Sequence, residues 1–155
     1  MAYGSIYYLQ DDKDTVPRSA SVTGTIETVK KKVIGSGTKF TSEFQAGDYL
    51  YVAAKSEVKR ITNIASDTEM TLESAFSSDV AAGGTPKLVK RMTARYVEIN
   101  NIGGGIAVLD GQNMANNTKV VFEKTPWGSS TAFSDLVDPV ILDAAPSDCQ
   151  ITIVK

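Results

Sequence analysis

The sequence predicts an all-β fold, which we expect to be a small barrel or sandwich of short antiparallel strands with an extended N-terminal arm. Short runs of alternating or continuous apolar residues recur along the 155 residues, and turns rich in glycine, asparagine and aspartate separate them. No apolar spacing requires a helix longer than about two turns. The composition, 42% hydrophobic and 22% charged, is that of a folded globular protein.

An N-terminal strand or arm is expected over residues 1–21. Four large apolar or aromatic side chains follow one another in it, and side chains of this size are costly to leave in water. We expect them to pack either on the domain or on a neighbouring subunit, which makes all four candidate interface residues. They are Ile6, Tyr7, Tyr8 and Leu9.

A compact β module is expected over residues 22–92. Phe40 and Phe44 are spaced to lie on one face of a single helical turn, and Gly47 suits a left-handed residue that ends such a turn. Residues 58–64 fit both a strand and a helix, and we favour a strand because the segment is short and rich in β-branched residues. The expected strands of this module cover residues 22–29, 49–53, 58–64, 70–72 and 87–92.

Residues 93–155 are expected to form a second β subdomain. The N-terminal strand could pair with strands of this subdomain, which would make residues 22–92 an inserted module, and the sequence leaves that arrangement open. Gly103–Gly105 interrupts a strand and predicts a bulge or tight bend, while Asp110-Gly111 predicts a turn. The expected strands cover residues 96–102, 106–109, 118–124, 140–142 and 150–154.

The composition argues against most catalytic chemistry. Histidine is absent, which removes the commonest general base and the commonest metal ligand. The single cysteine, Cys149, rules out an intrachain disulfide and is expected to be a small buried residue. A net charge of −2 is not that of a basic nucleic-acid surface. We find neither a signal peptide at the N-terminus nor an apolar run long enough to span a membrane.

Three local patterns invite a ligand-binding interpretation, and each has a plainer one. Gly35–Lys39 is glycine-rich, but a P-loop needs Gly-Lys-Ser/Thr at a set spacing, and Phe40 takes the hydroxyl position here. The three aspartates of Asp11–Asp14 lack the glycine and further ligands of a calcium loop, so a solvated turn is favoured. Lys30–Lys32 is expected to protect a strand edge from unwanted pairing.

Trp127 is the one large aromatic residue outside an expected strand, and it stands in a loop between Pro126 and Gly128. Such a residue either plugs the core or anchors an interface. The sequence gives the two roles equal weight, and we therefore add Trp127 to the candidate interface residues.

One ordered set of short motifs stands in the first half of the chain. The motifs are Val22-Thr23-Gly24-Thr25, the segment Gly35–Phe44, Gly47-Asp48, the strand with Val58, Ile61 and Ile64, and Ser66-Asp67-Thr68 through Leu72. Together they resemble a recurring module of structural proteins in tailed-bacteriophage particles. Similar modules occur in capsid decoration, tail and neck proteins. The resemblance covers roughly residues 22–80, about half of the chain.

The resemblance implies a non-enzymatic virion protein that works by assembling. The leading hypothesis is a capsid decoration (cement) protein, made in the host cytoplasm, that binds the major capsid protein or other virion proteins and forms a homo-oligomer, with a trimer as the first guess. A neck, tail or baseplate component is one alternative, and a receptor- or glycan-binding module using Trp127 is another. We expect no catalytic residue, cofactor or metal, and neither nucleic acid nor membrane as a partner.

Overall fold

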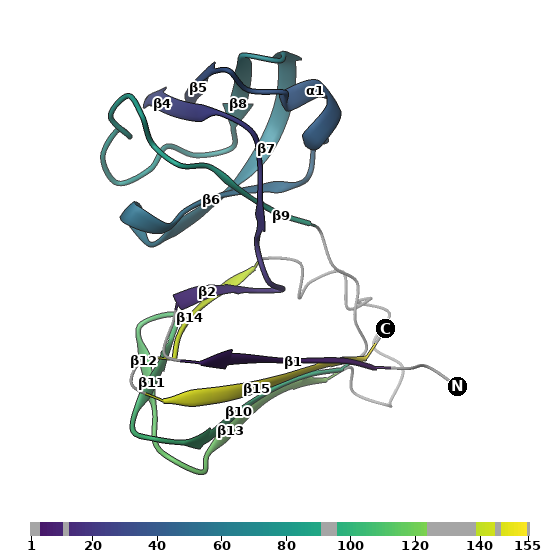
Figure 1. Ribbon diagram of the computed structural model, residues 1–155, viewed down its shortest axis with the longest axis vertical. Helices are drawn as coiled ribbons and strands as arrows, with labels where there is room; N and C mark the ends of the chain where they lie inside the picture. Colours follow the sequence, from purple (N-terminus) through teal and green to yellow (C-terminus); the bar gives the residue numbers. More distant parts are fainter. Residues whose placement is uncertain (1–3, 11–12, 91–95, 124–138, 145–146, 155) are drawn as a thin grey trace. The chain divides into compact units, whose positions relative to one another are not determined.

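The computed structural model describes residues 4–10, 13–90, 96–123, 139–144 and 147–154. These residues form an almost entirely β structure, so the predicted all-β class is confirmed (Figure 1). The chain divides into two compact units. The first unit contains residues 1–16 and 92–155, and the second contains residues 17–91.

The first unit contains a four-stranded antiparallel sheet in the order β1-β15-β10-β13 (Figure 1). Its outermost strand β1 pairs with β15 from Gly4 opposite Val154 to Gln10 opposite Asp148. Of the strand and the extended arm that the sequence left open for residues 1–21, the described N-terminal residues form a strand, and it pairs with a strand of the second half of the chain, an arrangement that the sequence also left open. The four strands are β1 (Gly4–Gln10), β15 (Asp148–Val154), β10 (Tyr96–Gly103) and β13 (Lys119–Glu123).

A second four-stranded sheet in the first unit has the order β12-β11-β14-β2. Buried residues of both sheets form one core, with Leu9 and Ile151 from the first sheet and Leu109 and Leu142 from the second, which makes this unit a sandwich. The predicted Asp110-Gly111 turn joins β11 to β12. The strands are β12 (Gln112–Met114), β11 (Ala107–Leu109), β14 (Val140–Asp143) and β2 (Lys13–Val16).

The glycine run Gly103–Gly105 bends the chain at the end of β10, as predicted. The register of β10 against β15 shifts between Asn101 and Gly103. The buried Asn101 amide donates to the Gly105 carbonyl at 3.0 Å and to the Met114 carbonyl at 2.9 Å. The Ser147 hydroxyl donates to the Gly103 carbonyl and contacts the Asn101 side chain. The polar groups around this bend thus stabilise the bend itself.

The second unit is built on one seven-stranded antiparallel sheet in the order β3-β9-β6-β7-β8-β5-β4 (Figure 1). The two outermost strands, β3 and β4, follow each other in the chain but do not pair with each other, so the described strands form an open sheet and not a closed barrel. A one-turn helix, α1 (Phe40–Glu43), and a short 3-10 helix, η1 (Ala53–Lys55), complete it. The strands are β3 (Ala20–Ser21), β9 (Lys87–Val89), β6 (Tyr49–Val52), β7 (Glu57–Ser66), β8 (Glu69–Leu72), β5 (Lys32–Ser36) and β4 (Thr25–Val29).

A separate core fills the second unit. The rings of Phe40 and Phe44 meet edge to face with centroids 5.9 Å apart, which confirms that one helical turn places them together. The predicted strand over residues 58–64 is confirmed as part of β7. Strand β6 is buried on both faces, as its continuous apolar sequence predicted. The fully buried members of this core include Ile26, Val33, Phe40, Leu50, Ile61 and Met70.

Two predictions in the second unit are wrong in detail. The expected strand over residues 22–29 begins only at Thr25, because Gly24 adopts a φ of +83° and turns the chain. A Cβ at Gly24 would lie 2.6 Å from the Ser36 carbonyl oxygen, so glycine is required there. Lys30 and Lys31 form the turn between β4 and β5 and do not line a strand edge.

Truncation of Leu9 tests whether β1 is part of the core. Leu9 has no exposed surface, so Leu9→Ala should lower the free energy of unfolding by about 2–5 kcal/mol, as large-to-small core substitutions do. Urea denaturation followed by circular dichroism measures the loss. The neighbouring Ile6→Ala is the control and should change stability far less, since the Ile6 side chain is 57% exposed. If both variants lowered the free energy of unfolding equally, the assignment of Leu9 to the core face of β1 and Ile6 to its outward face would be wrong.

Candidate functional site

The motifs that resemble phage proteins come together around Asp67, in the turn between β7 and β8. The Asp67 carboxylate accepts hydrogen bonds from the Thr41 backbone N–H, at 3.0 Å, and from the Thr41 hydroxyl. The Asp67 carbonyl accepts from the Thr38 hydroxyl at 2.5 Å and from the Phe40 N–H at 3.3 Å. The segment Gly35–Phe44 and the motif Ser66-Asp67-Thr68 therefore contact each other.

The hydrogen bonds at Asp67 also fix its ionisation. Donation from the Thr41 hydroxyl, and then from the Thr41 N–H, holds the pKa of Asp67 below its ordinary value of 3.8, and the nearby Lys39 charge adds to this. The carboxylate is exposed but its acceptor positions face the first turn of α1. Asp67 thus acts as a cap for that turn.

The Gly47-Asp48 motif has a structural role too. The buried Asp48 carboxylate accepts from the Gln45 N–H at 2.9 Å and pairs with the Lys90 ammonium at 3.0 Å. Its backbone carbonyl accepts from the Ile61 N–H at 2.8 Å, and the Gly47 N–H donates to the Ile61 carbonyl at 2.8 Å. These bonds fasten the corner before β6 onto β7.

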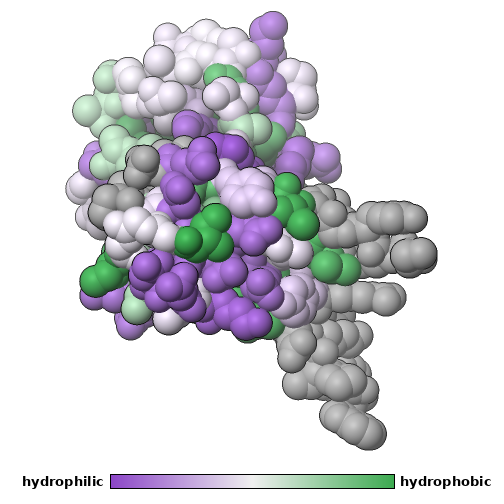
Figure 2. Space-filling view, turned by 60° about the horizontal axis from the view of Figure 1, so that its bottom comes forward, coloured by the Kyte–Doolittle hydropathy of each residue, from purple (hydrophilic) through white to green (hydrophobic). Residues whose placement is uncertain are grey.

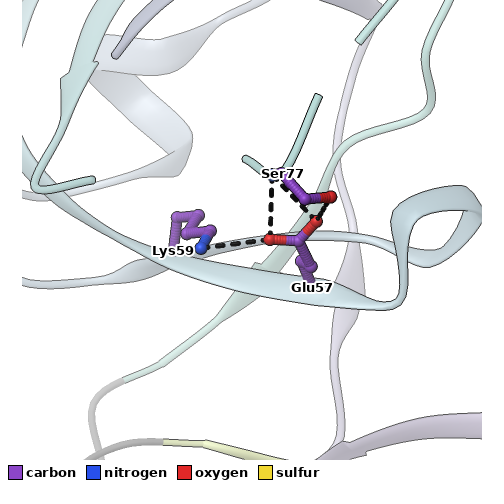
Figure 3. Close-up of polar contacts among 3 residues, drawn as sticks. All are labelled: Glu57, Lys59 and Ser77. Atoms are coloured by element: carbon purple, nitrogen blue, oxygen red, sulfur yellow. Dashed lines mark hydrogen bonds and ion pairs between the residues drawn. The ribbon is translucent and has the colours of Figure 1, made fainter. Parts of the chain in front are cut away.

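Glu57, Lys59 and Ser77 form the polar cluster that most resembles catalytic chemistry (Figure 3). The Ser77 N–H donates to Glu57 Oε1 at 3.0 Å, and the Ser77 hydroxyl donates to the same oxygen. Lys59 Nζ lies 3.1 Å from Glu57 Oε2 and 5.9 Å from the centre of the Phe76 ring.

The ionisation of Glu57 makes it a poor general base. Burial raises the pKa of Glu57, but the hydrogen bonds from Ser77 and Lys59 together outweigh burial and leave the pKa below its ordinary value. A carboxylate that binds a proton this weakly gives little driving force for deprotonating a serine. The cluster instead fastens the segment around Ser77 to strand β7.

The other ligand-binding patterns also resolve into internal contacts where the structure describes them. The backbone of Gly35 donates to the Thr68 carbonyl at 2.9 Å, so the glycine-rich segment packs on the β7–β8 turn. Asp14 is buried in β2 and accepts from the Thr15 N–H at 2.8 Å, while Asp11 and Asp12 lie outside the described residues. Across the described parts of the chain, no three histidine, cysteine, aspartate or glutamate side chains gather around a common point.

Cys149 is fully buried, as predicted. Burial, and then the neighbouring Asp148 charge, raise the pKa of the Cys149 thiol above its ordinary value. The thiol therefore stays protonated and unreactive at neutral pH.

The candidate interface residues of β1 divide between the two faces of the strand. Ile6 and Tyr8 point outward and are 57% and 49% exposed. Tyr7 is half-buried against the core, and Leu9 is a core residue, so Leu9 packs on its own domain, which is one of the two places that the sequence left open for it. The reason is the strict alternation of side chains along a strand. Trp127 lies outside the described residues.

The outward side of the β1-β15-β10-β13 sheet carries a mixture of side chains. The Tyr8 hydroxyl accepts from the Gln150 amide at 3.4 Å. Beyond β15, the Tyr96 hydroxyl donates to Glu98, and Lys119 Nζ lies 3.9 Å from the Glu98 carboxylate. Val121 on β13 is 37% exposed. On the face that Figure 2 presents, apolar residues lie singly among hydrophilic ones and form no broad apolar patch.

The feature that sequence reasoning missed is the position of β1 at the edge of its sheet. The apolar sequence of residues 6–9 predicted that this segment packs on something, but a strand's neighbours depend on contacts between distant parts of the chain. No local signal could have shown that β15 is the one neighbour of β1 among the strands that the structure describes.

No protein-family model, curated protein or solved structure matches this chain. Among the helices that the structure describes, none combines the length and the apolar character needed to cross a membrane.

The capping role of Asp67 can be tested by titration. Thr41→Val removes the hydroxyl that lowers the Asp67 pKa most, so the pKa should rise towards 3.8, measured by NMR across acidic pH. Because the folded-state pKa is lowered, the stabilisation by Asp67 is complete above the unfolded-state pKa and is lost as the pH falls through the folded-state pKa. The difference in Tm between the parent chain and Thr41→Val should therefore narrow on acidification.

Thr62→Val is the matched control for this titration. The Thr62 hydroxyl also lies on the second unit, where it donates to the Thr71 carbonyl at 3.1 Å and does not contact Asp67. The pKa of Asp67 should stay lowered in this variant. An unchanged pKa in Thr41→Val would contradict the capping role.

Proposed function

We propose that this protein is a structural component of a tailed-bacteriophage particle, and specifically a capsid decoration (cement) protein that stabilises the head. Its partners are then the major capsid protein and other copies of itself. It carries out no chemical reaction, and it works by occupying repeated positions on the shell.

The proposal rests on the motif set that resembles phage virion modules, and one structural observation supports it. The motifs of that set have a structural role, because Thr38, Thr41 and Asp67 form one interlocked contact and Asp48 secures the next corner. Hydrogen bonds of this kind hold the turns of the second unit against its strands and so favour a rigid unit. Rigid units that repeat on a lattice gain affinity through multivalency, which suits a cement protein.

The neck, tail or baseplate alternative uses the same resemblance and differs only in where the protein sits in the particle. The glycan-binding alternative depends on Trp127, and the described residues offer it no further support. The position of the protein in the particle is therefore the decisive measurement.

Cryo-electron microscopy of particles that contain and lack this protein tests the proposal. We expect difference density at repeated sites on the head, and we expect decorated heads to withstand a higher temperature before they open, because each bound copy stabilises its neighbours. The control is the particle that lacks this protein with the purified protein added back, which should restore both density and heat resistance. Density confined to the neck, tail or baseplate would replace the capsid assignment, and absence from the particle would overturn the proposal.

A further inference from the structure

Residues 22–24 join the two outermost strands of the open sheet in the second unit. Strands β3 and β4 lie at opposite ends of that sheet, so these three residues carry the chain from one end to the other. We propose that residues 22–24 are a latched strap, which Glu43 of α1 holds in place and which Asp67 secures by fixing α1. This inference concerns the second unit alone and does not depend on the proposed function.

Thr23, in the middle of the strap, is bound through both of its polar groups by one carboxylate. The Thr23 N–H donates to Glu43 Oε2 at 3.0 Å and to Oε1 at 3.2 Å, and the Thr23 hydroxyl donates to Oε1 at 2.6 Å. Hydrogen bonds to a charged acceptor are about twice as strong as neutral ones. Glu43 is the last residue of α1, so this clamp ties the strap to the helix.

The residues on either side of Thr23 also hold the strap close to the body of the unit. Val22 is partly buried against the core. Gly24 approaches the backbone so closely that a Cβ there would lie 2.6 Å from the Ser36 carbonyl oxygen and 2.7 Å from the Thr38 nitrogen. The strap therefore lies against the segment that leads into α1, and glycine allows this close approach.

The helix that carries Glu43 depends on contacts from outside itself. A single helical turn such as α1 is unstable in isolation, because fixing its residues gains very few hydrogen bonds. The side chain of its N-cap residue, Lys39, makes no capping hydrogen bond. The Asp67 carboxylate supplies the cap through the Thr41 N–H and hydroxyl. Asp67 at the start of the turn and Glu43 at its end therefore act in series on the strap.

This arrangement predicts that two distant clamps are energetically coupled. No hydrogen bond joins Thr41 to Thr23 within the described second unit, so an effect of one on the other passes through α1. Groups that belong to one hydrogen-bond network are coupled in this way. Loss of the Thr41 hydroxyl should loosen the hold of Glu43 on Thr23, although both of those residues are unchanged.

Hydrogen exchange of single amides in the full chain, followed by NMR, tests the latch. Glu43→Ala removes the clamp and should speed exchange of the Thr23 amide by about tenfold or more, because a hydrogen bond to a charged acceptor contributes at least that factor. Thr41→Val leaves Glu43 in place and should still speed exchange at Thr23 by about threefold or more. The Ile26 amide of β4, next to the strap, should follow Thr23 in both variants.

Ser77→Ala is the matched control. It also removes one exposed hydroxyl that donates to a carboxylate of the second unit, but its acceptor is Glu57, which contacts neither α1 nor the strap. This variant should leave exchange at Thr23 unchanged. Circular dichroism checks that all three variants are folded.

Three outcomes would overturn the proposal. An unprotected Thr23 amide in the parent chain would mean that the clamp is open. Faster exchange at Thr23 in Glu43→Ala but not in Thr41→Val would remove Asp67 from the latch. Equal acceleration at Thr23 by Ser77→Ala and Thr41→Val would show a general loss of stability in place of coupling through α1.

Discussion

The pairing of β1 with β15 is the interaction on which the architecture of this chain depends. It joins the two ends of the sequence over seven residue pairs and brings Leu9 into the same core as Ile151. The chain leaves this unit after Val16 and returns at Met92, so the second unit is an insertion between two segments of one sandwich. Each unit has its own core, and an insertion of this kind folds around contacts that are local to it.

Much of the fold could be predicted from the sequence because most strands carry their own signal. The continuous apolar run of β6 and the β-branched residues of β7 identify both strands without any knowledge of their partners. Pairing partners leave no such signal, and for that reason the sequence could neither place β1 at the end of a sheet nor choose between the domain and a neighbouring subunit for Leu9. Backbone geometry was a second source of error. The alternating sequence predicted a strand from residue 22, but the positive φ of Gly24 turns the chain, and β4 begins only at Thr25.

The same distinction applies to the candidate site. The motifs that stand out in the sequence stand out because few residue types can cap a one-turn helix or hold a tight corner, as Asp67 and Asp48 do. Their polar groups are used within the second unit. Ile6 and Tyr8 stand out in the sequence as large side chains of one apolar run, but the sequence does not show that these two, and not Leu9, are the exposed ones.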